Sequence, residues 1–288
     1  MVTSHTIKTG LICWPIGHSL SPVMHNSAFE ALGMDWVYLP LAVEPEHLED
    51  GIRGLKSMSF AGCNVSVPFK TRVIPYLDEL DEHARMMNAV NTIKVDNGKL
   101  YGFNTDAIGF IRQLKEEGVD PEGMSVLMIG AGGAARAALF GLAGYHIQKV
   151  SVLDVAESQM ISLKQDLSAV YSEGVLETAL MTPENLAVHS VGKTLVVNAT
   201  PIGMLPKVDA SPWPEPVPLP KEAVFFDIVY NPPETAFLRR AKAEGHQVIS
   251  GLGMLVNQGA ASFEIWTGRK PPLDIMYKVC REGLSIRD

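Results

Sequence analysis

Cysteine is scarce in this 288-residue chain, and blocks of basic residues and long apolar runs are absent. Cys13, Cys63 and Cys280 lie far apart with no CxxC pair, which argues against a disulfide framework and against a cysteine-ligated metal site. The formal net charge is −8 and no lysine/arginine block occurs, so nucleic acid is not an expected partner. The polar N-terminus and the breaks at Pro15 and Gly17 predict no signal peptide and no membrane span, and we expect a cytoplasmic protein.

The chain alternates apolar, β-prone runs with segments of helical period, which predicts an α/β fold with parallel sheets. Its length exceeds the roughly 100–200 residues usual for one domain. We predict an α/β substrate-binding domain over residues 1–106 and a Rossmann-type, doubly wound nucleotide domain over residues 107–250. Residues 251–288 are expected to form C-terminal helices that pack on the first domain.

Three local patterns make definite structural predictions. Ser21 followed by Pro22 is typical of a helix start, with the serine as N-cap. The dipeptide Asn97-Gly98 between two short β-prone runs predicts a tight hairpin turn. Prolines are so frequent between Pro206 and Pro220 that this segment is expected to be a surface loop.

A glycine-rich segment follows the predicted strand 126–129 and opens the next helix. Its spacing is GxGxxA, from Gly130 to Ala135. Glycine at these positions permits the turn and lets backbone N–H groups approach a pyrophosphate, while the helix N-terminus favours the anion. The sequence therefore predicts a dinucleotide site formed by Gly130, Ala131, Gly132, Gly133 and Ala134.

The acidic residue at the end of the following strand, Asp154, bears on the choice of dinucleotide. A carboxylate there can accept hydrogen bonds from the ribose hydroxyls and would repel the additional phosphate of NADP. No arginine occurs from Ser151 to Ser172. These features favour NAD, although Lys149 and Lys164 leave NADP open.

Hydride transfer also needs a group that exchanges the hydroxyl proton. Tyr145 and Lys149 have the spacing of a short-chain reductase pair but lie too close to the glycine loop for that role. The first domain instead places hydroxyl, amide, ammonium and carboxylate groups at segment ends, where a rigid scaffold can present them to a ligand. Such a set suits a small polyhydroxylated acid.

These segments resemble the shikimate dehydrogenase family, whose motifs recur here in order. In the first domain the matching segments are Pro15–Asn26 (PIxHSxSPxMHN), Asn64–Lys70 (NVTxPxK), Asn91-Thr92 (NT) and Gly102–Asp106 (GxNTD). Asn198–Met204, Asp227–Pro232 and Gly251–Gly268 continue the match, which covers nearly the whole chain. Ser66 replaces the threonine usual in the second motif, retaining the hydroxyl.

The resemblance implies the reversible, NAD(P)-dependent interconversion of shikimate and 3-dehydroshikimate in aromatic amino-acid biosynthesis. It implies that Lys70 exchanges the proton and that Asp106 orients it. Whether Lys70 starts protonated stays open, because a neighbouring carboxylate favours the charged form and burial the neutral form. The implied substrate ligands are Ser19, Ser21, Asn64, Ser66, Asn91, Tyr230 and Gln258. Beside the glycine loop and Asp154, the implied cofactor-binding residues are Thr200, Ile228 and Gly251.

Two alternatives stay open at this point. A quinate or dual quinate/shikimate dehydrogenase would share the fold and the chemistry, although Ser21, where quinate-preferring relatives often have threonine, favours shikimate. A non-catalytic dinucleotide-binding sensor is the second, and the presence of both Lys70 and Asp106 argues against it. His18 and His25 are expected to make structural hydrogen bonds rather than to catalyse. The sequence does not decide between a monomer and a homodimer.

Overall fold

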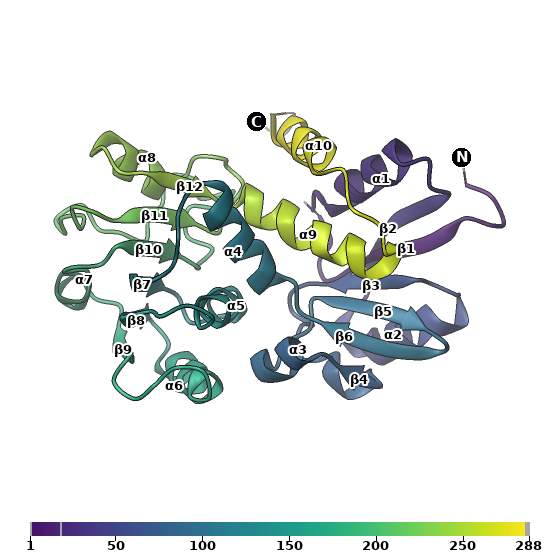
Figure 1. Ribbon diagram of the computed structural model, residues 1–288, viewed down its shortest axis with the longest axis horizontal. Coiled ribbons are helices and arrows are strands. Elements are labelled where there is room, and N and C mark those ends of the chain that lie inside the picture. Colours follow the sequence, from purple (N-terminus) through teal and green to yellow (C-terminus); the bar gives the residue numbers. More distant parts are fainter. Residues whose placement is uncertain (1, 18, 286–288) are drawn as a thin grey trace. The chain divides into compact units, whose positions relative to one another are not determined.

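The computed structural model describes residues 2–17 and 19–285 and divides them into two units (Figure 1). Unit 1 runs to Gly109 and resumes at Val256, and unit 2 spans Phe110–Leu255. Both are α/β, as predicted. Among the described residues, no helix is long and apolar enough to cross a membrane.

Unit 1 is built on a mixed six-stranded sheet in the order β2-β1-β3-β5-β6-β4. Its strands are β1 (Ile7–Cys13), β2 (Trp36–Ala42), β3 (Gly62–Val65), β4 (Glu79–Leu80), β5 (Thr92–Asp96) and β6 (Lys99–Phe103). The predicted hairpin is confirmed: β5 and β6 pair antiparallel, and the turn residues Asn97 and Gly98 have φ angles of 49° and 75°. Positive φ at both positions suits the twist of a two-residue hairpin.

Helices cover both faces of this sheet. They are α1 (Ser21–Ala31), α2 (Leu48–Ser57), α3 (Glu82–Met87), α10 (Leu273–Ser285), the start of α4 (Asp106–Glu116) and the later part of α9 (Leu252–Thr267), with 3-10 turns at Pro45–His47 and Ile74–Tyr76. α10 packs against α1, so the C-terminal helices return to the first unit. The chain enters α1 at Ser21, but Leu20 occupies the N-cap position, and no side chain in the described part of the chain caps the helix. The prediction of a Ser21 cap is therefore wrong.

A side chain of α1 covers the free edge of this sheet at β2. Asn26 Nδ2 donates to the carbonyl oxygen of Tyr38 at 2.9 Å, and Asn26 Oδ1 accepts from the Tyr38 N–H at 2.8 Å. The amide satisfies the two backbone groups that Tyr38 turns away from β1. Asn26 thus fastens α1 to the edge of the sheet.

Unit 2 has a fully parallel six-stranded sheet in the order β12-β11-β10-β7-β8-β9. Its strands are β7 (Ser125–Ile129), β8 (Lys149–Asp154), β9 (Leu176–Leu180), β10 (Leu195–Asn198), β11 (Val224–Asp227) and β12 (Val248–Ser250). Its helices are α5 (Gly133–Leu142), α6 (Glu157–Leu167), α7 (Pro183–His189) and α8 (Ala236–Ala243). The order reverses between β10 and β7, which is the doubly wound arrangement that binds ligands at the carboxyl ends of its strands.

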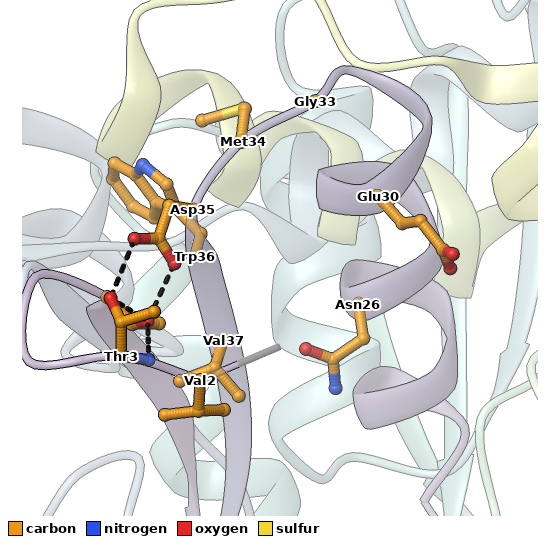
Figure 2. Close-up of a pocket in the computed structure, with 10 residues that line it drawn as sticks. Val2, Thr3, Asn26, Glu30, Gly33, Met34, Asp35, Trp36 and Val37 are labelled. Atoms are coloured by element: carbon orange, nitrogen blue, oxygen red, sulfur yellow. Dashed lines mark hydrogen bonds between the residues drawn. The ribbon is translucent and has the colours of Figure 1, made fainter.

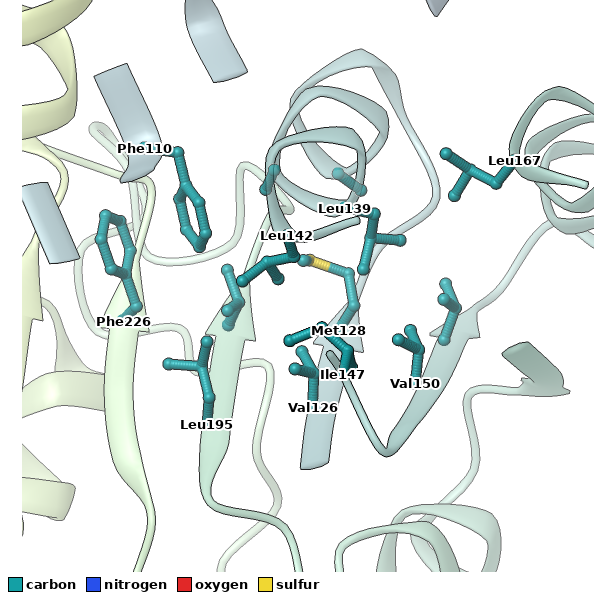
Figure 3. Packing of buried hydrophobic residues seen from close by; sticks show 14 of the residues in the cluster. Phe110, Val126, Met128, Leu139, Leu142, Ile147, Val150, Leu167, Leu195 and Phe226 are labelled. Atoms are coloured by element: carbon teal, nitrogen blue, oxygen red, sulfur yellow. The ribbon is translucent and has the colours of Figure 1, made fainter. Parts of the chain in front are cut away.

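Apolar side chains bury both faces of this sheet. On one face, Leu139 and Leu142 of α5 and Phe110 of α4 pack with strand residues such as Met128 (Figure 3). On the other face, residues of α7 and α8 pack on Leu127, Ile129 and the strands beside them. The sequence does not predict the edge strand β9, because most of its side chains are only half-buried and its apolar pattern is weak.

The proline-rich segment between Pro206 and Pro220 contains no helix or strand, as predicted, but it is not confined to the surface. Trp213 is only 2% exposed and packs against Phe225 and Phe237. Its Nε1 donates to the carbonyl oxygen of Val217 at 3.0 Å, and Arg240 donates to the same oxygen at 2.9 Å. The segment is anchored by one buried aromatic side chain, an exception that proline frequency alone cannot reveal.

We expect the Trp213→Phe substitution to lower the free energy of unfolding by roughly 1–3 kcal/mol, since it removes part of a buried ring together with its hydrogen bond. Urea denaturation measures the change. Trp14→Phe is the matched control, because Trp14 is 39% exposed and should be close to neutral. Equal stability of the Trp213→Phe variant and the unmodified protein would contradict the anchoring role.

Candidate active site

An ion pair joins the two residues predicted to be catalytic. Lys70 follows β3 and Asp106 is the first residue of α4. Lys70 Nζ lies 2.6 Å from Asp106 Oδ2, and the two side chains are 25% and 10% exposed. The ammonium group is therefore held by a largely buried carboxylate while part of the lysine side chain still reaches solvent. This geometry leaves Lys70 able to meet a ligand.

Asn91 fixes the orientation of the Asp106 carboxylate. Its Oδ1 accepts from the Thr105 backbone N–H at 2.8 Å, and because that group can only donate, the side-chain Nδ2 must face the other way. Nδ2 donates to Asp106 Oδ1 at 2.9 Å. Each carboxylate oxygen of Asp106 thus has its own donor, Asn91 on one side and Lys70 on the other.

Two further amides predicted to bind substrate lie in the same group of side chains. Gln258 Oε1 is 3.4 Å from Asn91 Nδ2. Asn64, which is 6% exposed, accepts from the Tyr38 hydroxyl at 2.8 Å, while its Nδ2 has three acceptors between 3.0 and 3.1 Å away. Its two N–H groups are therefore committed, and a lone pair on Oδ1 is the remaining capacity. Asn64 can receive a hydrogen bond from a ligand hydroxyl.

The predicted serines are placed at segment ends, as expected. Ser19 Oγ accepts from the Ser21 N–H at 3.1 Å at the start of α1. Ser66 comes directly after β3 and is half-buried, and its N–H donates to the Ile12 carbonyl oxygen at 2.9 Å. Tyr230 belongs to unit 2, where it follows β11.

His25 departs from the hydrogen-bonded role expected of it, and His18 lies outside the described residues. His25 is fully buried, and neither ring nitrogen has a hydrogen-bond partner among the described residues. Its ring stacks on Tyr38 with centroids 4.5 Å apart and lies 5.3 Å from Trp266. Burial lowers the pKa of His25 to about 3. The imidazole is thus a neutral member of an aromatic cluster.

Sequence reasoning did not identify four hydroxyl residues that support the site: Tyr38, Thr92, Thr105 and Ser262. All four are almost fully buried, and all contact the predicted amides. Each lies within or beside an apolar run, where a hydroxyl group has no pattern of its own. Thr92 and Thr105 fall inside motifs quoted for the first domain and Ser262 falls inside the matched segment Gly251–Gly268, and this is the available signal.

In unit 2 the turn from β7 to α5 has the geometry of an anion-binding loop. Gly130 has a φ angle of 102°, a region that L side chains rarely adopt. Gly132 occupies the N-cap position of α5, and no side chain caps the helix. A Cβ atom added to Gly132 or Gly133 would meet no atom of the described residues within 4 Å, apart from those of its chain neighbours and its own helix. The loop therefore combines a helix start that lacks a side-chain cap with open space beside its glycines, a combination suited to an anion.

The other predicted cofactor residues lie at the carboxyl edge of the same sheet. Asp154 Oδ2 accepts from the Ala131 N–H at 2.7 Å, which places its carboxylate beside the glycine loop. Thr200 also adjoins the loop, since a Cβ atom on Gly130 would lie 3.0 Å from its Cγ2. Gly251 and Ile228 are in contact, because a Cβ atom on Gly251 would lie 2.1 Å from the Ile228 carbonyl oxygen. All four residues therefore lie at or just beyond the ends of strands in the parallel sheet of unit 2.

A separate pocket of about 600 Å³ lies between the N-terminal segment, α1 and β2 (Figure 2). None of the predicted site residues lines it. Asp35, one of the two carboxylates that line it, already accepts from the hydroxyl groups of Thr3 and Thr6. We assign no ligand to this pocket.

Comparison with known proteins finds two matching family models. The model described as "Shikimate dehydrogenase substrate binding domain" matches residues 11–93, and that described as "Shikimate 5'-dehydrogenase C-terminal domain" matches residues 251–281. The first match contains Lys70, and the second contains Gln258 and Ser262. Both therefore fall on segments that form unit 1 and the end of unit 2.

Three similar proteins cover almost the whole chain. A shikimate dehydrogenase (NADP(+)) of Desulforamulus reducens is 43% identical, with 99% of this chain and 98% of the relative covered. The crystal structure of shikimate 5-dehydrogenase from Listeria monocytogenes with shikimate and NAD has a TM-score of 0.90 at 36% identity and covers 97% of this chain and 98% of its own. Quinate dehydrogenase from Corynebacterium glutamicum in complex with NAD has a TM-score of 0.88 at 29% identity and covers 96% and 99%.

Proposed function

This chain belongs to the shikimate dehydrogenase family and is an NAD(P)-dependent oxidoreductase, and we propose that Lys70 and Asp106 carry out its proton transfer. The observation that supports this assignment is the 2.6 Å contact between Lys70 Nζ and Asp106 Oδ2. The reaction interconverts shikimate and 3-dehydroshikimate, and both family membership and this pair favour an enzyme over a non-catalytic sensor.

In the oxidation direction the ring C–H hydrogen leaves shikimate as a hydride, and the proton of the same hydroxyl group passes to Lys70 Nζ. The bound nicotinamide supplies the hydride acceptor. In reduction, Lys70 returns the proton to the carbonyl oxygen. Asp106 stabilises the ammonium form that arises after proton uptake, and Asn91 prevents the carboxylate from turning away. A positioned general acid–base group of this kind contributes about 10²–10⁴-fold to the rate.

The remaining predicted ligands recognise the rest of the substrate. Asn64 and Gln258 lie beside the Lys70–Asp106 pair, where they can bond ring hydroxyls, and the free lone pair of Asn64 Oδ1 suits a hydroxyl donor. Ser19 and Ser21, at the start of α1, suit the substrate carboxylate, because hydroxyl groups and helix N–H groups both donate. Ser66, Asn91 and Tyr230 complete the proposed set.

The glycine loop Gly130–Ala134 is proposed to bind the pyrophosphate of the dinucleotide, with Thr200, Ile228 and Gly251 beside it. Two features support this role: the uncapped start of α5 and the open space at Gly132 and Gly133. A preference for NAD is the finer proposal, supported by the Asp154 carboxylate. Arg136, in the first turn of α5, is paired with Asp166 at 2.8 Å and so is already neutralised.

The Asp154→Asn variant tests this preference. Loss of the carboxylate charge is expected to lower the ratio of kcat/KM for NAD to that for NADP by about tenfold, which corresponds to about 1.4 kcal/mol. Asparagine keeps one oxygen that can accept from the Ala131 N–H, although it loses the acceptor that Asp154 offers to the Ala156 N–H. Glu157→Gln removes a nearby charge from α6 and is the control. An unchanged ratio in Asp154→Asn would argue against an NAD preference.

The overall assignment is tested by steady-state kinetics with shikimate and quinate, each with NAD and NADP. We expect shikimate to give the higher kcat/KM. Quinate is the second candidate substrate because a quinate dehydrogenase is similar over nearly the whole chain. Failure to oxidise either compound with either dinucleotide would overturn the proposed function.

A further inference from the structure

Three buried hydroxyl groups from separate elements of unit 1 meet beside the proposed active site. They belong to Ser262 of α9, Thr92 at the start of β5 and Thr105 just before α4, and all three residues are fully buried. Ser262 Oγ lies 2.8 Å from Thr92 Oγ1 and 3.2 Å from Thr105 Oγ1. In a buried network the groups share their hydrogen bonds, so removal of one changes the geometry that its neighbours adopt with their remaining partners.

Ser262 also contacts two of the proposed substrate ligands directly. Asn64 Nδ2 donates to Ser262 Oγ at 3.0 Å, and Ser262 Oγ donates to the Gln258 carbonyl oxygen at 3.0 Å. The Asn64 amide is thus hydrogen-bonded on both sides: its Oδ1 accepts from Tyr38, and its Nδ2 donates to Ser262. Gln258 lies one helical turn before Ser262, so the same hydroxyl group contacts the backbone that carries its side chain.

Ser262 is linked to Lys70 and Asp106 only indirectly, through other side chains. Thr105 and Asn91 lie between them, and Asn91 keeps its bonds to the Thr105 N–H and to Asp106 without Ser262. The hydroxyl group of Ser262 should therefore influence substrate recognition more than proton transfer.

We propose that Ser262 is a positioning residue for substrate binding, which orients the side-chain amide of Asn64 and bonds the backbone carbonyl of Gln258 without touching the substrate itself. The proposal rests on the proposed function, because it takes Asn64 and Gln258 to be substrate ligands. It adds to the substrate-binding machinery a residue whose side chain is fully buried.

The Ser262→Ala variant is expected to raise KM for shikimate about tenfold, as loss of one well-ordered polar contact does, while kcat falls less than about threefold. KM for the dinucleotide should not change, because the proposed dinucleotide residues all belong to unit 2. A general loss of structure would instead lower kcat and the midpoint of thermal unfolding together.

The Ser262→Cys variant separates hydrogen bonding from packing. Cysteine fills nearly the same space, but its thiol is a weak donor and acceptor. We expect it to resemble Ser262→Ala, whereas a packing role predicts that it resembles the unmodified enzyme. Because cysteine preserves the volume, this variant stays interpretable if Ser262→Ala folds poorly.

Thr267→Ala is the matched control on the same helix. Thr267 Oγ1 donates to the Phe263 carbonyl oxygen at 2.8 Å, as Ser262 does to Gln258, and Thr267 has no contact with the proposed ligands in the hydrogen bonds described for it. Its KM for shikimate should match that of the unmodified enzyme. An unchanged KM in Ser262→Ala, or in Ser262→Cys, would overturn the proposal. Failure of the proposed function is distinguishable, since the unmodified enzyme would then oxidise no shikimate.

Discussion

Replacing Lys70 by alanine is expected to lower kcat for shikimate oxidation by about 10²–10⁴-fold, because the variant lacks the group that takes the hydroxyl proton. Dinucleotide binding should be retained, since the glycine loop and Asp154 belong to unit 2. Stopped-flow or steady-state absorbance at the nicotinamide band measures kcat, and fluorescence titration with the reduced dinucleotide measures binding. Asp106→Asn is expected to lower kcat as well, because it removes the charge that holds the Lys70 ammonium group.

The control for this experiment is a second lysine–aspartate pair in unit 1. Lys56 Nζ lies 2.7 Å from Asp78 Oδ2, a distance close to that of the proposed catalytic pair, but both side chains are more than a third exposed. Lys56→Ala should therefore leave kcat unchanged. A kcat of the Lys70→Ala variant above about a tenth of that of the unmodified enzyme would contradict this role, because the proton would then have to pass to another group.

A loss of stability in acid is the second large effect, and we assign much of it to His25. Burial lowers the pKa of this imidazole from 6.5 to about 3. Below pH 6.5 His25 is protonated in the unfolded chain but stays neutral in the folded chain until about pH 3. The free energy of unfolding therefore has its full value above pH 6.5 and decreases as the pH falls from 6.5 to about 3. One pKa unit corresponds to about 1.4 kcal/mol, which gives a loss of roughly 3 kcal/mol by about pH 4.5.

His25→Phe and His25→Leu isolate this contribution. Neither side chain can be protonated, and each substitution removes two buried nitrogens that have no hydrogen-bond partner within residues 2–17 and 19–285. Urea denaturation at neutral and acid pH should show a smaller loss of stability on acidification in both variants, whatever their stability at neutral pH. Other groups titrate in this range, including Asp227. Burial raises the pKa of Asp227 to about 6, although the hydrogen bonds that its carboxylate accepts act in the opposite direction.

Comparing each His25 variant with the unmodified chain removes those shared contributions. The exposed His47 provides the control as His47→Leu. Identical pH dependence in the His25 variants and the unmodified protein would mean that the imidazole takes up its proton in the folded state, contrary to its fully buried position.

The parts of this protein that could be predicted from sequence are those whose determinants are local. The Asn97-Gly98 turn and the glycine loop at Gly130 depend on backbone angles that few residues adopt, so residue type reveals them directly. Lys70 and Asp106 are 36 residues apart in the sequence, and their pairing was predicted only through the family resemblance.

The parts that could not be predicted depend on contacts between distant segments. Asn64 and Ser262 are 198 residues apart, and no periodicity relates a strand end to a helix near the C-terminus. His25 has the same residue type as a catalytic or hydrogen-bonded histidine, and only the aromatic rings around it show that it is neither. Trp213 is hidden in the same way within a proline-rich segment.

The amide of Asn26 has a consequence beyond unit 1 itself. The unpaired backbone N–H and C=O groups of an exposed edge strand can pair with a strand of another molecule, and such pairing leads to aggregation. Here Asn26 occupies the outward backbone groups of Tyr38, and Pro40, two residues further along β2, has no N–H to offer. At Tyr38 one helix side chain thus takes the place of a neighbouring strand, and copies of the chain crowded together meet an edge with fewer backbone groups available for pairing.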